Sequence, residues 1–113
     1  MSKYNARKTV RMMPNGKART FDSQKEAARY DELAALLRAG KISDLRLQPE
    51  FTLQEAFVDS TGEPFRAVKY KADFSYVLDG IRVVEDVKGM RTKEYELKRK
   101  LVRDRFCVRV QEV

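Results

Sequence analysis

The sequence predicts an α+β, or mixed α/β, domain in the order helix, four strands, helix, strand. Three observations predict it: an apolar stripe at helical spacing near the start, alternating β-rich runs between turn residues, and a second helical pattern before a final apolar run. With 113 residues, 42% of them hydrophobic, the chain can bury one modest core but not two. Charged residues make up 36% of the chain, beside only 5 Gly and 3 Pro, which favours a globular protein over a disordered one.

The first twenty residues are predicted to form a basic arm or hairpin ahead of the main domain, residues 21–113. The first eight residues have the composition of a loose basic arm. Residues 10–21 are predicted to form a short hairpin around Pro14-Asn15-Gly16, because Asn-Gly suits a tight turn.

A first helix is predicted over residues 23–39. Asp22 or Ser23 is its N-cap, and Gly40 ends it. Glu26 lies one turn before Tyr30 and faces inwards beside the apolar stripe. It also fits a capping box with Ser23, in which its carboxylate bonds back to the N-cap amide. The predicted buried stripe consists of Ala27, Tyr30, Leu33, Ala34 and Leu37.

The rest of the chain alternates between strand and turn signals before a second helix. Strands are predicted over residues 42–47, 51–58, 65–77 and 81–87. Asp79-Gly80 is a strong hairpin signal between the last two. The second helix covers residues 93–104 and packs Leu97, Leu101 and Val102. A strand over residues 106–113 ends the chain, with Cys107 as a buried small hydrophobe.

Composition excludes several kinds of chemistry. The chain has no histidine, so Ser-His-Asp and Cys-His catalysis and the usual zinc hydrolase sites are ruled out. Its single cysteine cannot form an internal disulfide. A hydrolase of this composition must use carboxylates, lysine, tyrosine or a hard metal held by oxygen ligands. The lack of a signal-like or membrane-spanning apolar run predicts a cytoplasmic protein with no membrane partner.

The net charge of +7 is unevenly distributed. Bases dominate residues 1–20 and 88–109, whereas residues 22–87 carry more acids than bases. Two basic ends around an acidic middle indicate a polyanion such as DNA as the partner. The alternative is an ordinary solvated basic surface.

The predicted hairpin places two aspartates opposite each other. If Asp79 and Gly80 form the turn, Asp73 faces Asp86, and Lys88 shares their side of the sheet. Glu85 then points to the other side, with Phe74. Two facing carboxylates repel each other unless a cation lies between them. A turn one residue longer would exchange the two faces.

This set of residues suits phosphodiester hydrolysis. A Mg²⁺ ion held by one or two carboxylates neutralises charge on the phosphate and activates a water. Lys88 adds positive charge where negative charge develops in the transition state. The alternative is that Asp73 and Asp86 are solvated edge-strand residues and that Lys88 pairs with one of them.

Short motifs occur along nearly the whole chain: Lys3-Tyr4-Asn5-Ala6, Phe21-Asp22-Ser23, Glu26-Ala27, Tyr30, Leu47-Gln48-Pro49, Tyr70-Lys71-Ala72-Asp73-Phe74 and Asp86-Val87-Lys88-Gly89. Together these motifs resemble the PD-(D/E)XK nuclease superfamily, and within it a phage and prophage family of small Holliday-junction-resolvase-like nucleases. The resemblance implies a restriction-endonuclease-like core, a mixed sheet flanked by helices. It also implies Mg²⁺, with Mn²⁺ as a substitute, bound by Glu26, Asp73 and Asp86, and catalysis assisted by Lys88. Ala72 departs from the proline of the superfamily name.

Basic and aromatic residues around these motifs are predicted DNA contacts. Tyr95 and Lys98 lie one turn apart on a helix that borders the active site in similar nucleases. The alternative is a surface helix on which Glu94 and Glu96 pair with the bases. The predicted contacts are Lys3, Arg7 and Lys8 of the arm, together with Lys71, Arg91, Lys93, Tyr95 and Lys98.

The sequence therefore predicts a Mg²⁺-dependent endonuclease that acts on DNA in the bacterial host cell, and the resemblance implies the branched DNA of phage recombination as its substrate. Symmetric cutting of a four-way junction implies a homodimer. A nuclease with the same site and another role (nicking, packaging-linked cleavage or host-DNA degradation) stays open. So do a non-catalytic nucleic-acid-binding module and a small basic structural phage protein.

Overall fold

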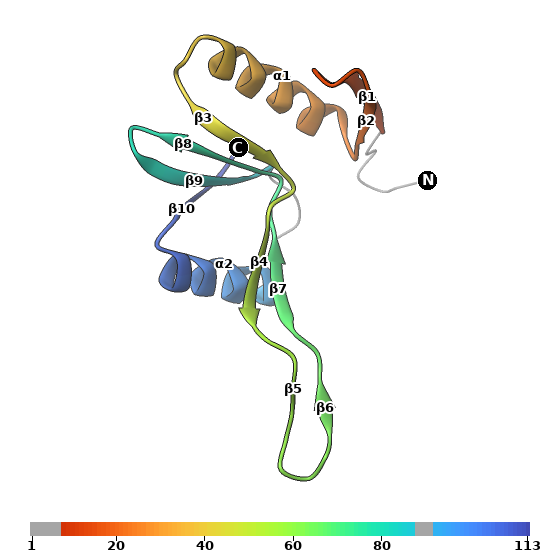
Figure 1. The fold of residues 1–113 in the computed structure, drawn as a ribbon, viewed down its shortest axis with the longest axis vertical. Coiled ribbons are helices and arrows are strands. Elements are labelled where there is room, and N and C mark those ends of the chain that lie inside the picture. The colour runs from red at the N-terminus through yellow and green to blue at the C-terminus, as the bar shows by residue number, and fades with distance from the viewer. Residues whose placement is uncertain (1–7, 88–91) are drawn as a thin grey trace. The chain divides into compact units, whose positions relative to one another are not determined.

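The computed structural model describes residues 8–87 and 92–113 (Figure 1). Within these residues the fold is mixed α and β, with two helices and ten strands, as the sequence predicts for the fold class. The chain divides between Ile42 and Ser43 into two compact units. The boundary differs from the one between arm and domain expected near residue 20, because the first helix packs on the preceding hairpin.

The first unit consists of a hairpin and a helix. Strands β1 (Thr9–Met12) and β2 (Ala18–Phe21) pair antiparallel, and α1 (Gln24–Arg38) contacts both. The tight turn includes Gly16, at φ +84°. Phe21 stacks on Tyr30 with ring centroids 5.3 Å apart, and Arg11 forms an ion pair with Asp31 at 2.9 Å. The predicted hairpin and first helix are thus confirmed.

The second unit is built on a four-stranded mixed sheet in the order β10-β9-β8-β3. Neighbouring strands pair antiparallel except β10 and β9, which are parallel. The parallel pair needs a crossover connection, and this connection contains α2. The strands are β3 (Ser43–Leu47), β8 (Phe74–Leu78), β9 (Ile81–Asp86) and β10 (Arg109–Glu112).

The predicted strands over residues 51–58 and 65–77 are each divided into shorter strands. Strand β4 (Glu50–Gln54) pairs with β7 (Val68–Lys71), and farther out β5 (Phe57–Val58) pairs with β6 (Pro64–Phe65). The chain changes sheets at Gln48, which has φ +50°, and opposite it at Ala72 and Asp73. The Gln48 N–H donates to the Asp73 carbonyl at 2.9 Å, and the Ala72 N–H donates to the Pro49 carbonyl at 3.0 Å. One strand over residues 65–77 was therefore a wrong prediction.

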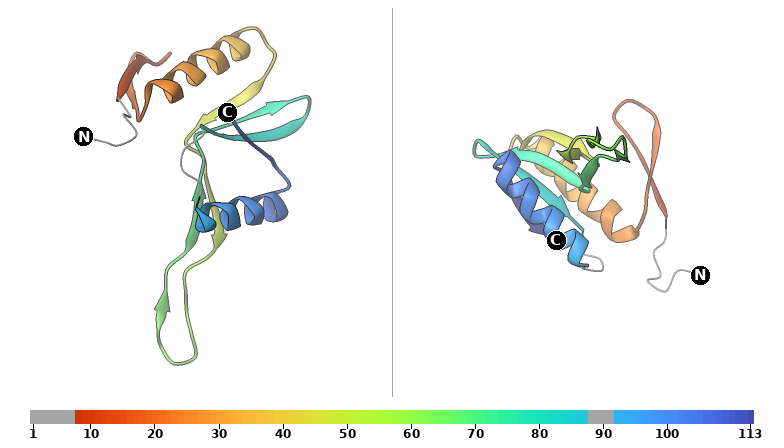
Figure 2. Two further views of the ribbon diagram at one scale, coloured as in Figure 1. Left: turned by 180° about the vertical axis from the view of Figure 1, so that it is seen from behind. Right: turned by 90° about the horizontal axis from the view of Figure 1, so that it is seen from below.

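Helix α2 (Lys93–Phe106) lies across β4 and β7 and leads into β10 (Figure 2). Val102 is fully buried in a core with Tyr70, Val84 and Val110. The Thr92 hydroxyl caps its start, and Cys107 caps its end with a left-handed backbone at φ +53°. Cys107 is exposed, so its predicted burial in a strand was wrong. No helix in the described ranges has the length and apolarity needed to cross a membrane.

Candidate functional site

The hairpin of β8 and β9 has the register that Asp79-Gly80 predicts. Leu78 pairs with Ile81, and the ladder continues to Phe74 opposite Glu85. Both turn residues have positive φ, +52° and +79°, as a two-residue hairpin turn of this kind requires. The ladder ends at the pair of Phe74 and Glu85, so the predicted pairing of Asp73 with Asp86 lies one step beyond it, where the Asp73 N–H donates to the Glu85 carbonyl.

Asp73 lies where β8 parts from its partner strands. Its backbone N–H donates to the Glu85 carbonyl at 3.0 Å. Its carboxylate oxygen Oδ2 accepts the Val87 N–H at 2.7 Å, in place of a backbone acceptor. The Asp73 carboxylate is therefore held against the backbone that directly follows Asp86.

Asp86 is a buried carboxylate held by two tyrosines from different elements. Its Oδ2 accepts hydrogen bonds from the hydroxyls of Tyr70 on β7 and of Tyr95 on α2, the latter at 3.0 Å. Burial raises the pKa of Asp86, and bonds from Tyr70, Tyr95 and the Asp73 backbone oppose that rise. Burial first, and then Asp86 itself, raise the pKa of both tyrosines. The tyrosines therefore stay protonated donors.

Glu85 occupies the other face of the hairpin. It is fully buried, and its carboxylate accepts bonds from the Tyr76 hydroxyl and, at 3.1 Å, from the Gln111 amide. Phe74 pairs with Glu85 and shares its face. The prediction that Glu85 points away from Asp86 is thus confirmed.

Glu112 is a site residue that the sequence reasoning missed. It pairs with Asp86 in the parallel register of β10 and β9, so the two side chains share a face. Its negative charge raises the pKa of Asp86. The available signal was its position two residues after Val110 in the last apolar run. That signal identifies Glu112 only when the parallel pairing of β10 with β9 is known.

Glu26 makes the bonds of a helix cap in the first unit. Its backbone N–H donates to the Ser23 hydroxyl at 3.0 Å, and its carboxylate accepts the Asp22 N–H at 3.1 Å. The acceptor bond goes to the amide before the N-cap, one residue earlier than the capping box predicts. Glu26 is 4% exposed. Its role as a metal ligand stays a prediction.

The predicted DNA contacts are only partly described. Lys3, Arg7, Lys88 and Arg91 lie outside the described residues. Lys8, Lys71 and Lys93 are exposed. Lys98 forms an ion pair with Glu94 at 3.2 Å, and Arg99 one with Glu96 at 3.8 Å. These pairs are those of the alternative reading, but exposed pairs of this kind are weak enough to exchange for a phosphate.

The chemistry of the donors suits Mg²⁺, which prefers oxygen ligands and is usually held by one or two carboxylates while keeping several waters. Asp73 and Asp86 meet this requirement at one end of the hairpin. Across residues 8–87 and 92–113, no three acidic or cysteine side chains converge as metal ligands would.

The model of a protein family described as a protein of unknown function, DUF1064, matches residues 1–112. The chain therefore belongs to this family. No curated protein and no solved structure matches the chain.

Proposed function

We propose that this protein is a Mg²⁺-dependent endodeoxyribonuclease with a restriction-endonuclease-like core of the PD-(D/E)XK type. The observation that carries the proposal is the end of the β8–β9 hairpin, where Asp73 and a buried Asp86 lie together. In the sequence, Lys88 follows Asp86 by two residues. The mixed sheet with α2 packed beside it is compatible with such a core.

Each residue of the proposed site has a distinct role. Asp73 and Asp86 would hold the metal, which when bound supplies charge neutralisation at the phosphate and a water that ionises near neutral pH. The hydroxyls of Tyr70 and Tyr95 fix the orientation of the Asp86 carboxylate. Lys88 would provide positive charge for the phosphate, and Glu26 would orient a water or a second ion.

A purely structural role explains Asp86 less well. Its burial raises its pKa, and Glu112 adds a second negative charge beside it. An ionised carboxylate in this setting opposes folding unless a cation compensates it, and strongly perturbed acids of this kind gather at functional sites. Bases in the predicted arm and on α2 would bring DNA to that cation.

The substrate proposed within this class is branched DNA, cut symmetrically by a homodimer. This finer assignment rests on the resemblance to junction-resolving phage nucleases. A nicking, packaging or host-DNA-degrading role would use the same residues on other DNA.

The deciding experiment incubates the purified protein with supercoiled plasmid and with a synthetic four-way junction, in Mg²⁺ or in EDTA. We expect cutting in Mg²⁺ only, and its loss in the Asp86→Asn and Lys88→Ala variants. Glu85→Gln is the matched control, because it alters the neighbouring buried carboxylate on the opposite face. Cutting that survives EDTA or persists in Asp86→Asn would overturn the proposal. Plasmid nicking without paired cuts in the junction would support the nuclease activity and contradict the four-way junction as its substrate.

Metal binding has a readout independent of cleavage. Since Asp86 lies among other carboxylates, millimolar Mn²⁺ should raise the melting temperature of the wild type. The Asp86→Asn protein should not respond. An equal response of both proteins would show that Mn²⁺ binds elsewhere.

A further inference from the structure

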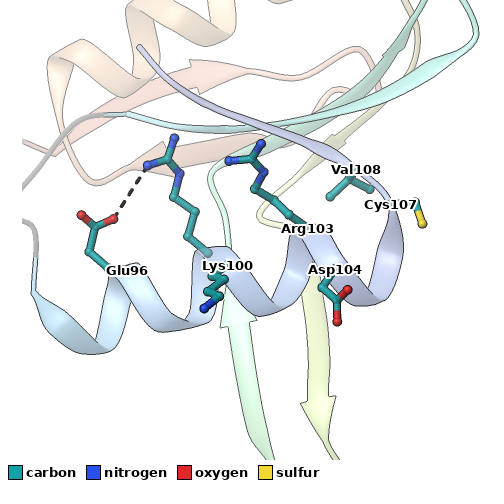
Figure 3. Close-up of a pocket in the computed structure, with 7 residues that line it drawn as sticks. Glu96, Lys100, Arg103, Asp104, Cys107 and Val108 are labelled. Carbon is teal, nitrogen blue, oxygen red and sulfur yellow. Dashed lines mark ion pairs between the residues drawn. The ribbon is translucent and has the colours of Figure 1, made fainter.

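A hollow of about 610 Å³ lies along α2 from Glu96 to Asp104 (Figure 3). Cys107 and Val108 close one end of it. Five charged side chains supply the rest of the lining: Glu96, Arg99, Lys100, Arg103 and Asp104.

Two arginines of this hollow are arranged for a common ligand. Arg99 and Arg103 are four residues apart, so they lie on one side of the helix, whereas the Lys100 side chain extends away from Arg103 (Figure 3). The opposite flank of α2 is different, since Lys98 pairs there with Glu94, and Arg105 donates to the Leu53 carbonyl of β4. The basic side chains of α2 are thus divided between two flanks.

Arg99 has unused capacity to donate. Its Nε–H is buried and has no hydrogen-bond partner in the described structure. Its ion pair with Glu96 spans 3.8 Å, near the upper limit for such a contact. A buried donor without an acceptor is rare and unfavourable, so it points to a ligand that supplies one. Guanidinium groups suit phosphate oxygens in particular, because their donors form a planar fork.

The hollow begins close to the proposed metal site. Arg99 follows Tyr95 by one helical turn, and Tyr95 donates to Asp86. From Tyr95 to Arg103 the helix axis advances about 12 Å, the axial length of roughly three to four nucleotides of one DNA strand.

We propose that this hollow binds backbone phosphates of the DNA strand, a few nucleotides from the phosphate at Asp86, through Arg99 and Arg103. The inference rests on the proposed function and extends it by giving the strand a path along α2. Asp104 and Glu96 line the same hollow, so its net charge is small and recognition depends on the two guanidinium groups rather than on a broad basic field.

Cys107 allows a test in the unmodified protein. It is the single cysteine of the chain, it is exposed, and it lines the hollow. In EDTA, where no cutting is expected, saturating DNA should slow its alkylation by N-ethylmaleimide at least about fivefold. Inorganic phosphate at millimolar concentration should not slow it, because the hollow is proposed to bind a strand with several phosphates. If inorganic phosphate protects Cys107 as well as DNA does, the hollow is a site for small anions and the proposed path of the DNA strand along α2 is wrong.

Two variants complete the test. Arg99→Gln and Arg103→Gln should each weaken DNA binding about tenfold, the loss of one charge-assisted contact, and should lower the salt slope by about one. The control is Arg66→Gln, an exposed arginine between β6 and β7. If DNA binds the wild type but leaves Cys107 unprotected, and both variants bind DNA as the wild type does, the proposed phosphate site in the hollow is wrong. The plasmid-cutting assay then still tests the proposed nuclease activity separately. Failure of DNA to bind at all would overturn the hollow directly.

Discussion

Glu85 and Asp86 are neighbours in the chain, both buried and both bonded to tyrosine, yet their surroundings differ. Glu85 is 0% exposed, and its partners Tyr76 and Gln111 come from strands of its own sheet. Asp86 is 9% exposed at the end of its strand, and its partners come from a second sheet and a helix.

The difference separates a structural carboxylate from a candidate catalytic one. Glu85 is enclosed by neutral donors, which satisfy it without any ligand. Asp86 has Asp73 and Glu112 at the same end of the sheet, and its pKa is raised. A buried acid with acid neighbours retains a need for a cation that a fully bonded one does not have.

The largest expected effect is on the cleavage rate, which tests the different roles of Asp86 and Glu85. Asp86→Asn should slow Mg²⁺-dependent cleavage by more than about 10²-fold, beyond the range for residues that only support a metal ligand. Glu85→Gln should stay within about threefold of wild type, since a supporting effect would already reach tenfold. Initial rates on supercoiled plasmid measure both. If Glu85→Gln lost as much activity as Asp86→Asn, the comparison would break.

The second prediction concerns stability, for which Glu85 should matter more than Asp86. Glu85→Ala removes a fully buried side chain and leaves the Tyr76 hydroxyl and the Gln111 amide without their shared acceptor. We expect a loss of about 2–4 kcal/mol in the free energy of unfolding, measured by urea denaturation. A loss below the precision of that measurement would show that water replaces the carboxylate and that Glu85 is not structural.

The third prediction concerns the tyrosines. Tyr95→Phe removes one of two hydroxyl donors to Asp86 Oδ2, so cleavage should slow about tenfold. DNA affinity in EDTA shows whether Tyr95 is also the DNA contact that the sequence predicts. Tyr76→Phe, the matched change beside Glu85, should leave the cleavage rate unaltered. If a higher Mn²⁺ concentration restores the cleavage rate of Tyr95→Phe, the variant has lost metal affinity, as a residue that positions Asp86 should. A change confined to DNA affinity would argue against positioning of Asp86.

The smallest effect is a pH-dependent gain in stability. Burial raises the pKa of Asp86 above its ordinary 3.8, so the folded protein holds this proton more tightly than the unfolded chain. That stabilisation is complete below the unfolded pKa and is lost as pH rises through the folded pKa. In EDTA at pH 7, Asp86→Asn should therefore melt about 2–5 °C above wild type.

Melting curves between pH 4 and pH 8 check this prediction, and the advantage of the variant should shrink towards the acid end. A variant that melts below wild type at pH 7 would mean that the bonds of the ionised carboxylate outweigh its burial. The contrast between a structural Glu85 and a candidate catalytic Asp86 would then not be supported by stability.

Features set by local chemistry were predictable from the sequence. The Asp79-Gly80 turn determines a register that every ladder pair from Leu78–Ile81 to Phe74–Glu85 follows. The cap at Ser23 and the two helices follow from equally local signals. In each case the deciding residues are within a few positions of one another.

Features set by distant pairing were not predictable. Glu112 meets Asp86 only because β10 joins β9 in parallel, and no local pattern encodes that choice. The break at Ala72 has no glycine or proline to announce it, so the strand pattern of residues 65–77 continued across it. Cys107 adopts a left-handed cap conformation that usually belongs to glycine or asparagine, which hid the end of α2.

Ala72 has a consequence for how relatives of this chain are recognised. Its N–H donates to the Pro49 carbonyl at the point where two strands change sheets together. Proline has no N–H to give, so proline at position 72 would lose this bond and disturb the crossing. The proposed relation to PD-(D/E)XK nucleases therefore does not require proline at this position of the chain.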